Sequence, residues 1–124
     1  ENPREWLQRL VQKLVDLHQS VKDFNRALDE LYYAKPDVAA VLDSHMEEIR
    51  AFVLDLLRQN AGRVRVKDLE AASVAIVDFI NALVDRIVFK ATAIEAERIL
   101  DVGVDMLYSA CFCSPGPNNE KVPR

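Results

Sequence analysis

The chain has 124 residues, of which 50% are hydrophobic and 29% are charged, enough for one folded domain that needs neither metal ions nor disulfides. Its formal net charge of -4 argues against direct binding to nucleic acid, because domains that grip a phosphate backbone are usually basic. No apolar run approaches the length of a membrane span and no signal-peptide pattern opens the chain. We therefore expect a soluble cytoplasmic protein that makes no membrane contact.

The N-terminal half is predicted to form two long helices. Asn2-Pro3 is a typical start, and apolar residues then recur at alternating spacings of three and four as far as Leu31. The weak helix formers that follow Ser20 allow a bend there. Lys35-Pro36 ends this helix, because the residue before proline avoids helical geometry. A second helix is expected from Pro36 to Asn60, with a buried stripe of Val38, Leu42, Ile49, Val53 and Leu56.

The third predicted helix, over residues 68–89, has an apolar arc of about 200°, roughly twice the minimum width of a core stripe. Thr92-Ala-Ile-Glu95 matches a capping box, so a fourth helix is expected to start there. Residues 113–124 lack periodicity and are rich in turn formers, which predicts a disordered tail after a domain of residues 1–112.

These patterns predict an all-α bundle of about four to five helices. One face of the last two helices would cover the first two, and the other face would meet the same pair of a second subunit in a four-helix bundle. The expected partner is thus an identical chain. Small residues that allow close approach, with their neighbours, define the predicted dimer interface: Ala75, Asp78, Ala82, Asp85, Ile99, Gly103 and Met106.

Polar side chains on apolar helix faces suggest where a ligand could bind. His18 lies one position from the first stripe and His45 lies within the second, so both are candidates for placed polar groups in a mostly apolar pocket. Two alternatives are open: either histidine can be a boundary residue partly in water, or both can be metal ligands, although no third ligand is evident. The predicted ligand-binding residues are His18, Val21, Tyr32, His45, Ile49, Phe52, Ile76 and Phe79.

No pattern typical of an enzyme is present. The sequence contains no glycine-rich phosphate loop, no nucleophile elbow and no histidine pair at metal-binding spacing, so we expect no catalytic residue, metal or cofactor. A phosphotransfer role for His45 is disfavoured because the expected neighbouring lysine and glycine are absent. Cys111 and Cys113 are too close for an unstrained mutual disulfide, which leaves a packed helix end or a bridge between subunits.

Three segments carry a resemblance to a known family: HMEEIRAFVLDLLRQ, DLEAASVAIVDFINALVDRIVF and ERILDVGVDMLYSA. Together with the order of elements, they resemble the C-terminal regulatory domain of tetracycline-repressor (TetR) transcription factors, as far as about Tyr108. The resemblance implies that the last two helices dimerise and that the preceding helices enclose an effector cavity. It also implies a fragment, because DNA would be bound only through a helix-turn-helix domain that is not present in this chain.

Two hypotheses for function follow. The first is an effector-binding and dimerisation domain that senses a small apolar or amphipathic molecule, because few polar groups point inward and no basic cluster awaits a phosphate. The second is a ligand-free helical dimerisation or protein-interaction module. A pocket lined by His18 and His45 would favour the first hypothesis, and a filled core would favour the second.

Overall fold

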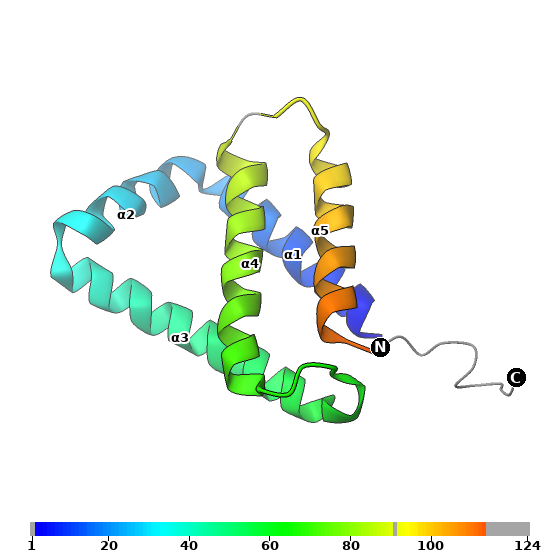
Figure 1. Cartoon of the computed structure of the whole chain (residues 1–124). Helices are drawn as coiled ribbons and strands as arrows, with labels where there is room; N and C mark the ends of the chain where they lie inside the picture. The colour runs from blue at the N-terminus through cyan, green and yellow to red at the C-terminus, as the bar shows by residue number, and fades with distance from the viewer. Residues whose placement is uncertain (1, 91, 114–124) are drawn as a thin grey trace, which may run out of the picture.

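A computed structural model describes residues 2–90 and 92–113, which form five α-helices and one short 3-10 helix (Figure 1). The all-α class predicted from the sequence is confirmed. The bounds are α1 Pro3–Ser20, α2 Lys22–Ala34, α3 Pro36–Gln59, η1 Ala61–Arg63, α4 Leu69–Phe89 and α5 Ala96–Cys111.

The first predicted helix is divided in two at Val21. This residue has φ -123° and ψ 36°, outside helical geometry, and it caps α1 and starts α2. The bend expected after Ser20 is therefore a full break. The start of α1 is as predicted, because the side chain of Asn2 accepts a hydrogen bond from the backbone N–H of Glu5 at 3.0 Å.

The last helix begins later than predicted. Glu95 is in an extended conformation and makes no side-chain capping bond, so α5 starts at Ala96. The hydroxyl of Thr92 instead accepts a hydrogen bond from the N–H of Ile94, two residues on, at 3.2 Å. The expected capping box was wrong because Thr92 closes a local turn in the connection and does not cap the helix.

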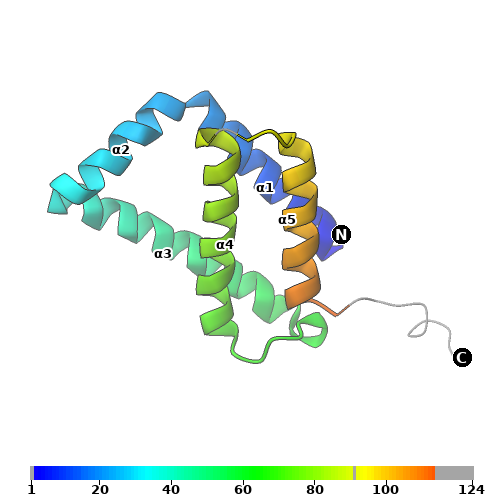
Figure 2. The same ribbon diagram turned by 45° about the horizontal axis from the view of Figure 1, so that its top comes forward.

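Four elements surround the main core. The views in Figures 1 and 2 agree that α4 and α5 lie side by side and that α1 crosses behind them, and the C-terminal part of α3 packs across the base of α4. The buried residues of α1 follow an i, i+4 row, a ridge typical of helices that cross at a steep angle. The core comprises Leu7, Val11, Val15, Val53, Leu57, Ile76, Val77, Ile80, Val84, Val88, Leu100, Val104, Leu107, Cys111 and Phe112.

The remaining part of the chain projects from this core as an arm, defined here as residues 22–52: α2 together with α3 up to Phe52. No residue of α2 is buried, and the buried residues of α3 begin only at Val53. At the tip of the arm, α2 and α3 are joined by a hydrogen bond of 2.8 Å that the hydroxyl of Tyr32 donates to the carboxylate of Asp43. We call the rest of the helical assembly, α1, α4, α5 and residues 53–59, the body.

The loop after α3 is clipped to the end of α5. Val64 forms an isolated antiparallel bridge with Phe112, and the N–H of Arg65 donates to the carbonyl of Cys111 at 2.8 Å. The N–H of Cys113 likewise donates to the carbonyl of Arg63 at 2.6 Å. Cys113, predicted to begin a disordered tail, is thus held in place; residues 114–124 of that predicted tail lie outside the described residues.

Candidate functional site

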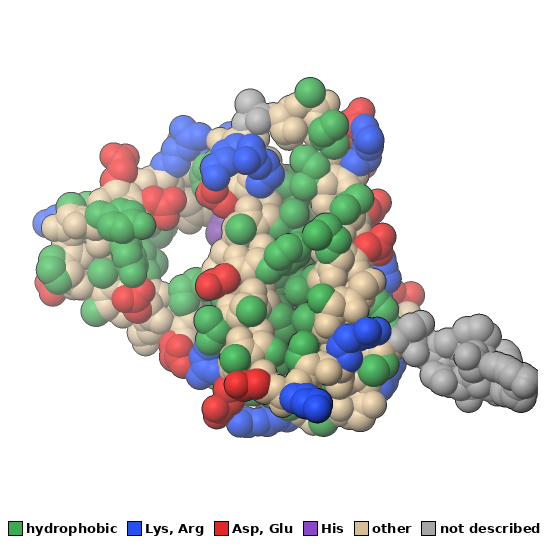
Figure 3. Space-filling view, viewed as in Figure 1, with side chains coloured by type: hydrophobic (Ala, Val, Ile, Leu, Met, Phe, Trp, Pro, Cys, Tyr) green, Lys and Arg blue, Asp and Glu red, His purple; other side chains and the backbone are tan. Residues whose placement is uncertain are grey.

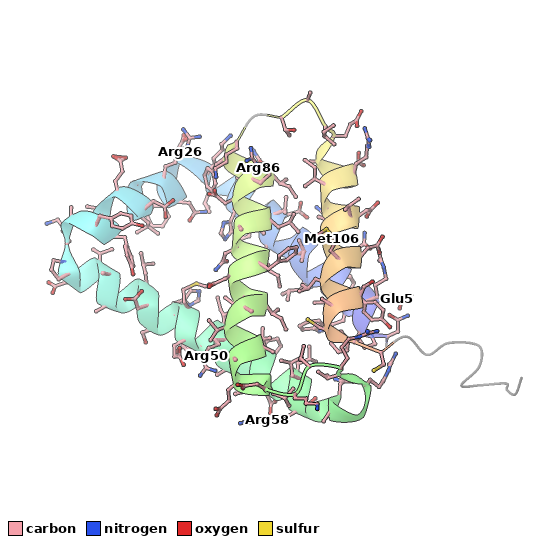
Figure 4. The ribbon with its side chains drawn as sticks, in the orientation of Figure 1. Glu5, Arg26, Arg50, Arg58, Arg86 and Met106 are labelled. Carbon is pink, nitrogen blue, oxygen red and sulfur yellow. The ribbon has the colours of Figure 1, made fainter. Side chains whose placement is uncertain are left out.

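The α4–α5 face carries exposed apolar side chains. Figure 3 shows hydrophobic side chains gathered along the seam between these two helices, and Figure 4 labels Met106 on α5. Val74 on α4 is 48% exposed, and Val102 and Met106 on α5 are 57% and 58% exposed. A groove of about 360 Å³ lies in this seam, lined by Val66, Ala72, Ala75, Ile76, Phe79, Met106, Leu107, Ala110 and Cys111.

Most of the predicted dimer residues lie on the surface of α4 and α5. Ala75, Asp78, Ala82 and Met106 are exposed, while Ile99 is half-buried. Asp85 is also half-buried, and its carboxylate lies 3.2 Å from the ammonium group of Lys90 in the same chain. These positions therefore leave an open apolar face with acidic groups on it.

Gly103 makes its close contact inside the chain. It is buried, and a Cβ added there would lie 2.6 Å from the Cδ2 atom of Leu83 on α4. The missing side chain therefore lets α5 approach α4 of the same subunit. Sequence reasoning placed this residue at an intersubunit contact because spacing alone does not tell which neighbouring helix a glycine approaches.

The predicted ligand-binding residues do not gather around one cavity. Ile76 is buried in the core and Phe79 is half-buried, and both line the α4–α5 groove. The ring of Phe52 lies 6.1 Å from that of Trp6, and Phe52 is 58% exposed. Tyr32 is at the tip of the arm. His18 and Ile49 are half-buried and Val21 is exposed.

His45 is on a different row of α3 from the one that faces the core, so its predicted place on the buried stripe was wrong. Its side chain is exposed, with Nδ1 3.8 Å from a carboxylate oxygen of Glu48. The inward row of α3 runs through Leu42, Met46, Ile49 and Val53. His45 and Phe52, seven residues apart, share the adjacent row. That row is exposed because a helix that crosses α4 turns only one of two neighbouring rows inward.

The base of the body is filled. The hollow lined by Trp6, Leu57, Ile80 and Phe112, among others, measures only about 10 Å³, room for one water molecule at most. An open gap is present elsewhere, between the arm and α4, as Figure 3 shows. Leu28 on α2 and Leu42 and Met46 on α3 are half-buried, so the arm keeps apolar side chains that a tighter packing would cover.

A polar contact joins the arm to α4 where the two cross. The guanidinium of Arg50 donates to the hydroxyl of Ser73 at 3.1 Å and to the carboxylate of Glu47 at 2.8 Å (Figure 4 labels Arg50). Ser73 is fully buried and its hydroxyl also donates to the carbonyl of Glu70 at 2.7 Å. The hydrogen bond from Arg50 lowers the pKa of Glu47 below its ordinary value. Sequence reasoning missed Arg50, although a charged residue next to the inward row was a usable signal.

Two hydrogen-bonded pairs tie the start of α1 to α5. Arg4 donates through Nε to the carboxylate of Asp105 at 2.8 Å, and the amide of Gln8 donates to Asp101 at 2.9 Å. Both acidic residues are exposed on α5. Their hydrogen bonds fix the start of α1 against a helix of the exposed apolar face.

The cysteines and acidic residues form no reactive centre in the described part of the chain. Cys111 is buried in the core and burial raises the pKa of its thiol, while Cys113 is exposed, and both are free. Among residues 2–90 and 92–113, no three His, Cys, Asp or Glu side chains gather as they would around a metal ion. None of the described helices is long and apolar enough to cross a bilayer.

Comparison with known proteins agrees with the resemblance seen in the sequence. A family model described as "Tetracyclin repressor-like, C-terminal domain" matches residues 1–111, which include all five helices. No curated protein matches the chain. Because the match spans most of the chain, the chain belongs to the tetracycline-repressor-like C-terminal domain family.

Proposed function

We propose that this chain is the effector-binding and dimerisation domain of a TetR-like transcriptional regulator in the cytoplasm. In this role it senses a small apolar or amphipathic molecule and allosterically controls a DNA-binding domain carried elsewhere in the regulator. Membership of the family supports the general role of regulator domain. The exposed apolar face of α4 and α5 carries the dimerisation part of the proposal, and the open arm supports effector binding.

Dimerisation through α4 and α5 removes the exposed apolar seam from water. Each buried Val or Met side chain in such a contact contributes about 1.5–3 kcal/mol relative to full exposure. A two-fold interface uses the same patch on both subunits. The side chains around Met106 of one subunit can therefore fill the groove of the other subunit, and the reverse contact is identical. The small side chains of Ala75 and Ala82 let the two α4 helices approach closely.

The effector is proposed to lie between the arm and α4. Half-buried apolar side chains line this side of the arm, and an amphipathic molecule would cover them. The molecule must bind two arrangements of the domain unequally if it is to shift their populations. The contacts of Arg4 and Gln8 with α5 offer a route by which a change in the pairing of the subunits would move the N-terminal end of α1.

One observation favours the second hypothesis, a dimerisation or protein-interaction module without a ligand. The base of the body is filled, and neither His18 nor His45 lines the groove or the base hollow. In that case the arm would serve as a docking element for a partner, or would close on α4. Ligand binding by the isolated domain distinguishes the two hypotheses, whereas dimerisation is common to both.

The dimer is tested by Met106→Asp, which places a carboxylate in the proposed interface. We expect the dimer to weaken by about 100-fold or more, because the interface would have to bury an unpaired charge. Sedimentation velocity over a range of protein concentrations measures this change. The matched control is Val41→Asp, which changes an apolar residue of similar exposure on the arm.

The control variant should sediment like the unchanged protein. If Met106→Asp and Val41→Asp are both dimers at every concentration, the α4–α5 interface is refuted. Circular dichroism of both variants confirms that a change in sedimentation comes from association and not from unfolding.

A further inference from the structure

Two residues of opposite charge on the exposed side of α4 have no partner among the described residues of the chain. Of the charged residues of this helix, Glu70 and Asp85 lie 3.8 and 3.2 Å from basic groups of the same chain. The other two, Asp78 and Arg86, are both exposed, and the described residues offer their side chains no ion pair or hydrogen bond. A carboxylate and a guanidinium are therefore left on the face that is proposed to dimerise.

Asp78 and Arg86 cannot pair with each other inside one chain, because eight residues of α-helix place them about 12 Å apart along the axis. Figure 4 shows Arg26 of α2 beside the end of α4 that carries Arg86. The guanidinium of Arg26 is engaged there: it lies 5.6 Å from the ring centre of Phe89 and donates to the carbonyl of the same residue at 3.5 Å. Arg86, in contrast, is available to a group outside the chain.

Asp78, Ala82 and Arg86 form one i, i+4 row on α4, and all three are exposed. The row lies on the side of the helix away from its buried residues, which are Ser73, Ile76, Val77, Ile80, Val84 and Val88. In the commonest class of helix packing, the i, i+4 rows of two helices run alongside each other at a crossing angle of about −50°. The small side chain of Ala82, in the middle of the row, leaves room for such a crossing.

A two-fold axis that runs across α4 beside Ala82 would bring the opposite charges together. This symmetry reverses one helix relative to the other, so the residue four positions before the axis meets the residue four positions after it. Asp78 would face the partner's Arg86, and Arg86 would face the partner's Asp78. An axis beside Ala75, the other small residue of this face, would instead place Asp78 against the partner's Ala72 and leave both charges unpaired. Charge complementarity therefore selects the register centred on Ala82.

We propose that α4 packs against α4 of a second copy of this chain about a two-fold axis beside Ala82, in a register set by two ion pairs between Asp78 of one subunit and Arg86 of the other. The inference rests on the proposed dimerisation through α4 and α5, to which it adds the register and the charges that select an identical chain. It also accounts for an acidic residue on a mainly apolar face, because two copies of Asp78 brought into one interface would repel unless each met a cation.

The test reverses each charge alone and then both together. Asp78→Arg and Arg86→Asp each create two like-charge contacts in the dimer, so each should raise its dissociation constant about 10-fold or more. The double variant restores two opposite pairs and should return the constant to within about 3-fold of that of the unchanged chain. Sedimentation velocity over a range of protein concentrations measures the constant, at low ionic strength because salt screens exposed pairs.

The net charge of the chain provides an internal control. Asp78→Arg adds two positive units to the formal net charge of -4, and Arg86→Asp removes two. General repulsion between acidic subunits would therefore strengthen one dimer and weaken the other, whereas the proposed ion pairs predict weakening in both. Asp29→Arg, at an exposed position of α2, makes the same change in net charge as Asp78→Arg and should not weaken the dimer. Circular dichroism checks that each variant keeps its helices.

A cysteine at the axis gives a second measurement of the register. In a chain whose exposed free cysteine is removed by Cys113→Ser, Ala82→Cys should form a disulfide between the subunits on mild oxidation. Residues beside a two-fold axis lie close to their own copies, and a disulfide needs Cα atoms within about 7 Å. Ala75→Cys is the matched control: it lies seven residues from the axis on each helix, so its two copies should be about 20 Å apart and should not cross-link.

Four results would overturn the inference. A dimer that neither single reversal weakens would leave the proposed function intact but would not have this register. Weakening in both single variants without recovery in the double variant would show that the two charges do not face each other. Cross-linking through Ala75→Cys in place of Ala82→Cys would put the axis elsewhere on α4. An unchanged chain that is monomeric at every concentration would count against this inference and against the dimerisation part of the proposed function.

Discussion

The body and the arm of this domain are both helical, yet they differ in what holds them together. In the body, α1, α4 and α5 bury continuous rows of Val, Leu and Ile, and Val11 and Val104 have no exposed surface at all. In the arm, α2 buries none of its residues, and Phe24 and Tyr33 are 62% and 89% exposed. The contacts described for the arm are mainly polar and lie at its ends.

This difference separates two tasks within one small domain. A face that dimerises needs a rigid support, and the packed core of the body supplies it beneath α4 and α5. A site that accepts a molecule needs apolar surface that is still uncovered, and regions with few buried contacts open at low free-energy cost. The arm meets that condition because it is fixed at its base by Arg50 and Arg26 and is otherwise loosely packed.

The largest expected effect on the free energy of unfolding comes from changing a leucine to alanine, once in the body and once in the arm. Leu57→Ala removes a fully packed side chain from the body and should lower the free energy of unfolding by about 2–5 kcal/mol. Leu28→Ala removes the same atoms from the half-covered face of α2 and should cost about 1 kcal/mol or less, since alanine also favours the helix. Urea unfolding of both variants measures the difference.

Equal losses for the two leucine variants would contradict the comparison, because they would place Leu28 in a core as dense as that around Leu57. The slope of the unfolding transition serves as an internal check. A changed slope for either variant would signal that the unfolded or native state had altered in compactness.

The sequence predicted the helices well because each helix leaves a local signal. Asn2 and Asp68 cap α1 and α4, since each side chain accepts a hydrogen bond from the backbone N–H three residues further along the chain. Pro36 begins α3. The break at Val21 could only be expected as a bend, since the apolar spacing continues through it. Periodicity describes a helix as if it were straight, so the regular apolar spacing that runs as far as Leu31 includes Leu17 and Phe24, although both are exposed.

The candidate site was harder to predict because it depends on how helices cross. On α3, the rows that contain His45 and Met46 are adjacent, and packing against α4 shows which one faces inward.

A smaller effect is expected at the contact between Arg50 and Ser73. Ser73→Ala removes a buried hydroxyl that bonds to Arg50 and to the carbonyl of Glu70, and should lower the free energy of unfolding by about 1 kcal/mol. The matched change in the arm is Ser44→Ala on an exposed face, which should raise stability by about 0.5 kcal/mol or less because alanine favours helices. Stability gained in both variants would show that the hydroxyl of Ser73 contributes nothing.

The smallest expected effect concerns the tip of the arm and is seen as a shift in titration. The hydrogen bond from Tyr32 to Asp43, and then the negative charge of Asp43, raise the pKa of the Tyr32 hydroxyl above its ordinary value of 10.0. Since the folded-state pKa is the higher one, the stabilisation from this bond is complete below pH 10.0 and is lost as pH rises through the folded-state pKa. Ultraviolet absorbance of tyrosinate follows the titration, and the difference between the unchanged chain and Tyr32→Phe isolates this residue from Tyr33 and Tyr108.

Asp43→Asn should return the pKa of Tyr32 toward 10.0, because it removes the charge and weakens the acceptor while preserving the shape of the side chain. Core residues of the body should show no change in this variant, which can be followed by amide hydrogen exchange at Val84 and Val104. A Tyr32 pKa that is the same with and without the Asp43 carboxylate would mean that the tip is open in solution. Slower or faster exchange at Val104 would mean that the tip and the core are coupled, and the division between arm and body would then have to be redrawn.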